Sequence, residues 1–226
     1  MREQNTTQTE FLSDRLNCVI KEDNQFETTL RQKLAEEYAN VRDGVHVTDL
    51  ALCMRQALFR KIDPRAPTTK QLGYFLDGAR RHQTLQTLYG EGVAEKEGTF
   101  EGIHYTIDIF DNFPIEFKTT RAKAAISDHW VRQIVFYMLA TNAPIGLLQV
   151  QRILARDEDP FPGFIITLDD RQRADWLKDF RERSNRFLEA MDKRDPSLLP
   201  IYRGEKDWVC RECPYRPRCD RIEGVA

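Results

Sequence analysis

The spacing of apolar residues predicts three helices in the first ninety positions. Residues 26–38 carry an apolar side chain at every fourth position, the period of a helix with one apolar face. A second helix is expected to begin at Thr48, a typical N-cap residue, and to end before Pro64. The third spans residues 70–89, and Gly90 supplies its stop signal.

Beyond this point the pattern changes from a helical period to alternation. Residues 93–120 alternate as strands do, interrupted by the turn signal at residues 111–114. A helix over residues 127–141 and strands at residues 145–154 and 163–168 follow. The last long helix is amphipathic, and these residues are expected on its apolar side: Leu177, Phe180, Phe187, Leu188 and Met191. This order predicts an α/β fold with a small mixed central sheet flanked by helices.

Length and composition predict one soluble globular domain with appendages. The chain has 226 residues, of which 41% are hydrophobic and 31% charged. We expect an N-terminal tail and helix over residues 1–45, a core over residues 46–200, and a C-terminal segment over residues 201–226 that packs with Cys53. No apolar run approaches the ~20 residues of a membrane span, and the polar start lacks a secretory segment. A cytoplasmic protein without membrane contact is therefore expected.

The charge distribution is uneven although the formal net charge is only −2. Between Arg55 and Arg81 there are seven Lys or Arg residues against two acidic ones. Such a stretch can line a groove for a nucleic-acid backbone, although a charge run is more often a solvated face.

Asp108, Glu116 and Lys118 form the candidate catalytic pattern. If the Asp-Asn-Phe run before Pro114 forms a hairpin loop, Phe110 pairs with Pro114, and Asp108 falls opposite Glu116. Directly opposite Cβ atoms lie about 4.5–5.5 Å apart, so the two carboxylates repel unless a divalent cation joins them. Lys118 shares a strand face with Glu116, where it can orient or deprotonate a water and offset negative charge. The pattern predicts phosphodiester cleavage, whereas an isolated Glu-x-Lys run usually marks a solvated strand face.

This pattern resembles the PD-(D/E)XK nuclease superfamily, and His82 with the Gln-x3-Tyr motif at Gln133 and Tyr137 resembles its RecB-like branch. The resemblance implies that one or two Mg²⁺ or Mn²⁺ ions are held by these groups: His82, Asp108, Glu116 and the backbone carbonyl of Phe117. It implies that Gln133 and Tyr137, which share a helix face, help to hold Lys118 and contact the substrate strand. An imidazole ligand favours Mn²⁺ over Mg²⁺.

The cysteines form a second pattern. Cys210, Cys213 and Cys219 follow a C-x2-C-x5-C spacing, and a fourth ligand has to come from Cys18 or Cys53. Four-thiolate zinc sites usually combine two C-x2-C pairs, so three clustered cysteines and a distant one fit a 4Fe–4S cluster better, with zinc as the alternative. The arrangement resembles RecB-like nucleases with an iron–sulfur cluster, which implies that Cys53 is the fourth ligand. Cys18 is then a small buried hydrophobe, and the cluster is a structural clamp.

Residues 46–221 together resemble the fourth CRISPR-associated (Cas) protein family, whose members are stand-alone RecB-like exonucleases. This resemblance implies metal-dependent cleavage of single-stranded DNA from its ends. It further implies trimming of prespacers beside the CRISPR adaptation integrase, although a viral or phage homologue in replication or recombination would carry the same residues. Two alternatives remain open: a non-catalytic iron–sulfur module that binds DNA, and a structural zinc protein.

Overall fold

The computed structural model describes most of the chain, in seven ranges: 24–38, 42–90, 93–121, 125–153, 159–202, 208–211 and 213–224. It divides into two compact units, Met1–Asn40 with Ala66–Leu72 and Val41–Arg65 with Gly73–Ala226. The first unit contains helix α2 (Asn24–Tyr38) and the first residues of α5 (Thr69–Tyr89). The second unit contains the candidate catalytic residues and Cys53, Cys210, Cys213 and Cys219, whereas Cys18 lies outside the described residues.

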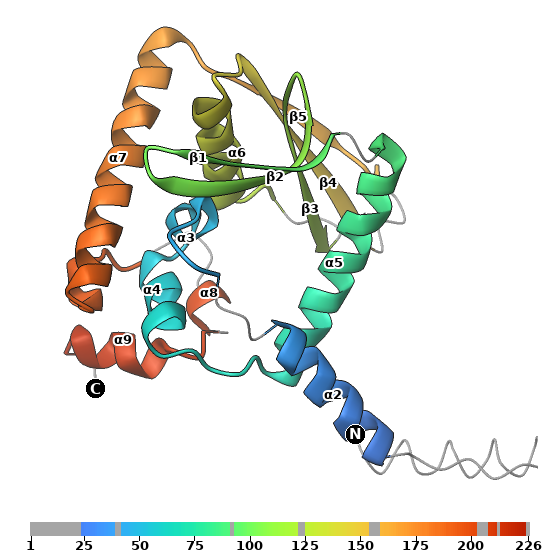
Figure 1. The fold of residues 1–226 in the computed structure, drawn as a ribbon, viewed down its shortest axis with the longest axis vertical. Helices are drawn as coiled ribbons and strands as arrows, with labels where there is room; N and C mark the ends of the chain where they lie inside the picture. The colour runs from blue at the N-terminus through green and yellow to red at the C-terminus, as the bar shows by residue number, and fades with distance from the viewer. Residues whose placement is uncertain are drawn as a thin grey trace, which may run out of the picture. The chain divides into compact units, whose positions relative to one another are not determined.

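The second unit is built on one five-stranded sheet (Figure 1). Its strands follow the order of the sequence: β1 (Ala94–Phe100), β2 (Ile103–Asp111), β3 (Phe113–Arg121), β4 (Ile145–Ile153) and β5 (Gly163–Thr167). Only β3 and β4 are parallel, and α6 (Asp128–Thr141) connects them and packs on both. The predicted mixed sheet flanked by helices is therefore confirmed.

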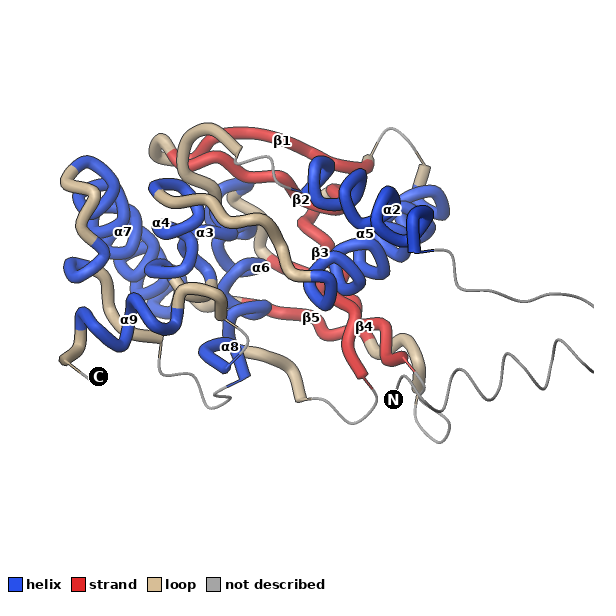
Figure 2. Tube along the Cα trace, turned by 90° about the horizontal axis from the view of Figure 1, so that it is seen from below, coloured by secondary structure: helices blue, strands red, loops and turns tan. Residues whose placement is uncertain are grey.

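Helices cover the sheet on both sides, as Figure 2 shows. One side is packed by α6 together with α3 (Val47–Ala51), α4 (Met54–Ile62) and α7 (Asp170–Asp192). The main core lies there and includes Ile107, Phe136, Phe180 and Phe187, none of which is exposed. On the other side Phe117 contacts α5 through the rings of His82 and Tyr89.

The apolar side of α7 is narrower than predicted. Phe180 and Phe187 are fully buried, but Leu188 is 40% exposed. The prediction for Leu188 is wrong because it follows Phe187 by about 100° around the helix, which turns its side chain to the solvent edge.

The predicted single helix after Thr48 is two helices, α3 and α4. His46, not Thr48, is the N-cap of α3, because its backbone N–H donates to Asp49 Oδ2 at 2.9 Å. The helix breaks at Leu52, and Cys53 is the N-cap residue of α4. A candidate ligand therefore stands at a helix start, where the backbone direction changes.

The strand-like region contains two turns, one more than predicted. Glu101 and Gly102 both have positive φ, 48° and 82°, and form a two-residue turn between β1 and β2. The second turn has Asn112 at its apex with φ 61°. The helix predicted at residues 127–141 is α6 with Ser127 as its N-cap.

The C-terminal segment packs against α4. After the 3-10 helix η1 (Pro196–Leu198) come α8 (Trp208–Arg211) and α9 (Arg216–Ile222). Tyr215 is 2% exposed, and its ring stacks on Phe59 of α4 with centroids 5.2 Å apart. This contact brings the cysteine-bearing end of the chain to the helix that starts at Cys53. Within the described ranges, no helix has the length and apolar character to cross a membrane.

Candidate active site and cysteine site

The candidate active site lies where β2 and β3 separate. Backbone pairing near the turn includes the predicted pair of Phe110 with Pro114, but it does not reach Asp108 and Glu116. Instead Asp108 Oδ2 accepts the backbone N–H of Phe117 at 2.8 Å. The predicted direct pairing of Asp108 with Glu116 is absent from these two fully described strands. The backbone N–H of Phe117 in β3 donates to the Asp108 carboxylate, where a regular strand pair would have it donate to a backbone carbonyl of β2.

Helix α5 brings His82 to this point. His82 Nδ1 lies 3.5 Å from Asp108 Oδ1, and the ring stands edge-on to Phe117. Burial lowers the pKa of His82, but its contact with the Asp108 carboxylate outweighs burial and raises the pKa above its ordinary value. Gln86 Nε2 also donates to the backbone carbonyl of Asp108 at 3.5 Å, so α5 is attached to β2 beside the carboxylate.

Glu116 is a buried carboxylate with one oxygen left without a donor. It is 2% exposed, and the ammonium of Lys118 contacts its Oε1. Its Oε2 is buried and has no hydrogen-bond partner among the described residues. Burial raises the pKa of Glu116 to about 7; Lys118 opposes this increase and Asp108 adds to it. A buried carboxylate oxygen without a donor is costly, so this position favours a cation or a proton.

Helix α6 supports Lys118 from behind. Lys118 Nζ donates to Gln133 Oε1 at 3.0 Å, and Gln133 Nε2 donates to the Tyr137 hydroxyl at 2.9 Å. Gln133 is 7% exposed and Tyr137 1%, and burial raises the pKa of the Tyr137 phenol well above its usual value. The two side chains thus form a buried hydrogen-bonded support for Lys118.

The chemical types of the candidate ligand groups suit a divalent cation. Two carboxylates and an imidazole are suitable ligands for Mg²⁺ or Mn²⁺, and the buried Glu116 Oε2 lacks any other partner in the described part of the chain. In the described ranges, no group of three or more His, Cys, Asp or Glu side chains is arranged to hold a metal ion as it stands. Lys118 contacts Glu116 Oε1, and Asp108 Oδ2 is taken by the Phe117 N–H, so Glu116 Oε2 and Asp108 Oδ1 are the oxygens left for a cation.

Replacing Glu116 by Gln should stabilise the protein against heat in EDTA. A carboxyl whose pKa rises from 4.5 to about 7 on folding loses stabilising free energy as the pH rises between these values, about 3 kcal/mol in all. Glu116→Gln removes this loss, so its melting temperature should exceed that of the wild type by about 6–12 °C at pH 8. The difference should shrink towards pH 4.5 in melts followed by circular dichroism.

Glu101→Gln is the matched control for this measurement. Glu101 lies in the turn between β1 and β2 and is exposed to solvent. Its hydrogen bond with Arg181 lowers the pKa of its carboxyl group, so its replacement should change the melting temperature little. A Glu116→Gln variant less stable than the wild type at pH 8 would contradict the assignment of a strained buried carboxylate.

The cysteine site joins α4 to the C-terminal segment. Gln56 Nε2 of α4 lies 3.5 Å from Cys213 Sγ. Burial raises the pKa of the Cys53 thiol to about 11, and the neighbouring thiols Cys213, Cys219 and Cys210 add to the increase. The three C-terminal thiols therefore lie near Cys53, and none of the four cysteines forms a disulfide. Their geometry is not that of a metal site in the described ranges, and Cys18 lies outside those ranges.

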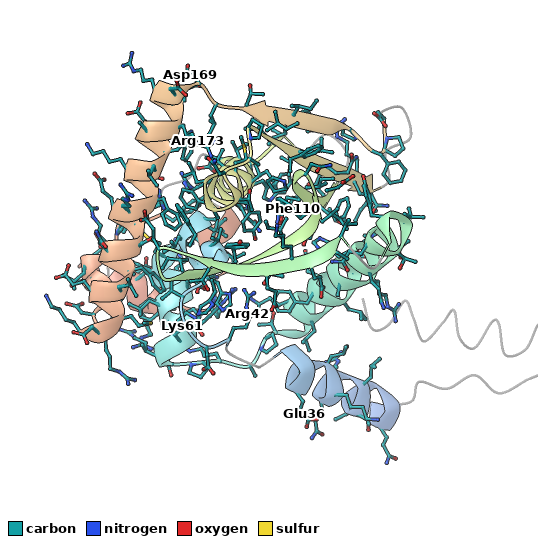
Figure 3. The ribbon with its side chains drawn as sticks, turned by 45° about the horizontal axis from the view of Figure 1, so that its top comes forward. Glu36, Arg42, Lys61, Phe110, Asp169 and Arg173 are labelled. Carbon is teal, nitrogen blue, oxygen red and sulfur yellow. The ribbon has the colours of Figure 1, made fainter. Side chains whose placement is uncertain are left out.

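The basic segment between Arg55 and Arg81 does not form a uniform basic face. Arg55 is 4% exposed, and its Nε donates to the carbonyl of Leu199 at 2.7 Å. Lys61 donates to the carbonyl of Arg42 at 3.2 Å, and Figure 3 shows these two residues close together. Arg55 and Lys61 therefore bind backbone carbonyls of distant parts of the chain.

Sequence reasoning did not identify the arginines that border the cysteine site. Arg132 of α6 donates to the carbonyl of Ala51 at 2.7 Å, and Arg183 of α7 donates to that of Leu50 at 3.1 Å. Both carbonyls lie at the end of α3, just before Cys53. No local pattern signals such contacts, because each joins residues that lie far apart in the sequence.

Several solved structures resemble this chain. The crystal structure of SSO0001 shares 20% sequence identity with it, and the match covers 86% of this chain and 95% of that chain with a TM-score of 0.56. A phage related exonuclease from Haemophilus somnus 129PT shares 12% identity, with 71% of this chain and 97% of that chain covered and a TM-score of 0.44. An alkaline exonuclease (LHK-Exo) from Laribacter hongkongensis shares 11%, with coverages of 72% and 95% and a TM-score of 0.45.

The likeness to SSO0001 supports the fold alone, given its low identity. No curated protein sequence matches the chain. A family model described as the PD-(D/E)XK nuclease superfamily matches residues 107–220, just over half of the chain. The match includes Asp108, Glu116 and Lys118 and extends through the three C-terminal cysteines. The chain therefore belongs to the PD-(D/E)XK nuclease superfamily.

Proposed function

We propose that the protein is a deoxyribonuclease that depends on Mg²⁺ or Mn²⁺ and removes nucleotides from the ends of single-stranded DNA. The observation that carries this proposal is the buried Glu116 carboxylate. Its Oε2 lacks a donor among the described residues, while Lys118 contacts Oε1 and the Asp108–His82 pair lies on the neighbouring elements. The superfamily of the chain supports nuclease chemistry at this site.

In this proposal His82, Asp108, Glu116 and the carbonyl of Phe117 would hold the divalent ion, and the ion would supply Lewis-acid stabilisation of the scissile phosphate. Lys118 is the group that acts on water and phosphate. Its ammonium donates to Gln133 Oε1 at 3.0 Å and to Glu116 Oε1, which uses two of its three N–H donors and leaves the third for a water or a phosphate oxygen. Tyr137 acts indirectly: its hydroxyl accepts a hydrogen bond from Gln133 Nε2 and so orients the amide that binds Lys118. Lys118 thus orients the attacking water and offsets the charge that develops on the phosphate.

We also propose that Cys53, Cys210, Cys213 and Cys219 bind a 4Fe–4S cluster. Burial raises the pKa of the Cys53 and Cys219 thiols, and the neighbouring cysteines add to the increase, so a positively charged metal centre would favour their thiolate forms and supports this proposal. The cluster would join the start of α4 to the C-terminal segment, which is a structural role. Four-thiolate zinc is the alternative, and iron and zinc analysis of protein purified without oxygen distinguishes the two.

The biological role that we propose follows from the resemblance of residues 46–221 to the fourth Cas family. In a cytoplasm with a CRISPR array, the enzyme would trim prespacers beside the adaptation integrase. A phage or viral homologue would instead process DNA ends in replication or recombination. The genes that neighbour its own distinguish these two roles.

Digestion of single strands labelled at the 5′ or the 3′ end tests the nuclease proposal. We expect stepwise shortening with Mn²⁺ or Mg²⁺ and none in EDTA. Asp108→Asn should reduce the rate by at least about 100-fold, because the amide can still accept the Phe117 N–H but no longer binds a cation as a carboxylate does. DNA binding without cleavage at any metal concentration would contradict the proposal and favour a non-catalytic DNA-binding module.

A further inference from the structure

Two buried helix-end carbonyls lie directly before Cys53, and each is bound by an arginine from another helix. Leu50 and Ala51 end the five-residue α3 and are 0% and 2% exposed, so their carbonyl groups cannot rely on water. Arg183 Nη1 donates to Leu50 O at 3.1 Å, and Arg132 Nη1 donates to Ala51 O at 2.7 Å. The turn that presents Cys53 is thus fixed by α6 and α7.

Asp179 of α7 joins the two guanidinium groups. Its Oδ2 lies 3.0 Å from Arg183 Nε and 3.9 Å from Arg132 Nε. A carboxylate between two arginines offsets their mutual repulsion, which keeps both directed at the end of α3.

The same turn of α6 also contacts the C-terminal side of the cysteine site. Asp128 lies 3.9 Å from Arg132 Nη2 and accepts from the Tyr202 hydroxyl at 3.5 Å. The backbone carbonyl of Tyr202 in turn accepts from Cys210 Sγ at 3.6 Å. The first turns of α6 are therefore in contact with chain segments that carry two of the four cysteines, Cys53 and Cys210.

Gln133, which holds Lys118, is the next residue after Arg132. An α-helix moves as a rigid element, so a shift of Arg132 displaces Gln133 with it. The far end of α6 is fixed as well, because Arg173 of α7 donates to the carbonyls of Met138 and Ala143 at 3.2 and 3.1 Å. Figure 3 shows Arg173 near the start of α7, beside the end of α6. Arg132 is therefore one of the contacts that fix the first turns of α6, together with the contact of Asp128 with Tyr202.

We propose that Arg132 is a positioning residue for the nuclease reaction, which couples the Cys53 turn to the Lys118 ammonium through α6. This inference rests on the proposed function, because it assigns a catalytic role to Lys118. A displacement of Lys118 by about 1 Å is enough to lower the rate between tenfold and a hundredfold. Disturbing the cysteine site or Arg132 should therefore lower kcat and leave KM unchanged.

A cycle of Arg132→Met, Cys53→Ala and the double variant tests the coupling. Met keeps the apolar stem of the side chain and removes the donors to Ala51. Each single variant should lower kcat at least about tenfold with KM within twofold, and the double variant should be no slower than the slower single one. Losses that multiply would overturn the proposal. Cys210→Ala, which perturbs the site from the Tyr202 side, replaces Cys53→Ala if that variant does not fold.

Amide hydrogen exchange in EDTA provides a readout that needs no DNA cleavage. Arg132→Met should increase exchange both in residues 51–54 and in residues 117–119 of β3. Arg181→Met is the matched control, because its exposed guanidinium on α7 pairs with Glu101, away from α3. Faster exchange confined to residues 51–54 would overturn the coupling, even if the wild type proved to have no nuclease activity.

Discussion

Replacing Lys118 by Gln should lower the rate of single-strand cleavage by about 10³-fold and leave DNA binding within about threefold of the wild type. The reason is the position of its ammonium, in contact with Glu116 Oε1 and 3.0 Å from Gln133 Oε1. Gln retains a donor for Glu116 but has no charge to offer to a phosphate and no amine to act on water. Single-turnover cleavage and fluorescence anisotropy with a labelled strand measure the two effects.

The choice of Gln keeps this experiment interpretable. Lys118→Ala would leave the buried Glu116 without its donor, so a loss of activity could reflect unfolding. Lys178→Gln is the control, because its side chain is 77% exposed and pairs at 3.9 Å with Glu182 on α7. A Lys118→Gln variant that cleaves within tenfold of the wild type would remove Lys118 from the mechanism.

Replacing Cys53 by Ala should abolish the visible absorption of iron–thiolate charge transfer in protein purified without oxygen. It should also lower the melting temperature by about 10 °C. A cluster that joins the start of α4 to the C-terminal segment closes a very long loop, and such closures contribute several kcal/mol. Absorption spectra, iron analysis and thermal melts measure these losses.

Cys18→Ala is the matched control for this variant. Cys18 is expected to be a small buried hydrophobe, so its replacement should keep the iron and the colour. If Cys18→Ala loses the iron and the colour and Cys53→Ala keeps them, Cys18 is the fourth cluster ligand in place of Cys53. Zinc in place of iron in the wild type would support the zinc alternative.

The sequence was most informative where local signals agree with tertiary packing. Helix α6 begins after Ser127 and ends before Asn142, which is left-handed with φ 54°, and both ends are close to the predicted positions. The alternation of apolar and polar residues also predicted β4 and β5 well. The break at Leu52 left no such signal, because the residues on both sides favour a helix and the break depends on contacts with α6 and α7. The turn at Glu101–Gly102 could have been recognised from its glycine.

For the candidate site, the motif identified which side chains come together but not how they bond. The hydrogen bond from the Phe117 N–H to Asp108 replaces a ladder bond, and only three-dimensional coordinates reveal such an exchange. The contacts of Arg183 with Leu50 and of Arg132 with Ala51 could not be predicted from the sequence either, because contacts between distant residues leave no periodic pattern in it. The buried positions of Gln133 and Tyr137 likewise follow from the packing of α6 on the sheet.

The turn at Asn112 also determines which insertions and deletions this protein can accept. Adding or removing one residue there would shift β3 by one position and exchange its two faces, turning Ile115 and Phe117 towards α6 and Glu116 towards α5. A change of length at Glu101–Gly102 would instead alter β1, which carries none of the candidate residues. Natural variants of this chain should therefore differ in length at the first turn and keep a fixed length at the second.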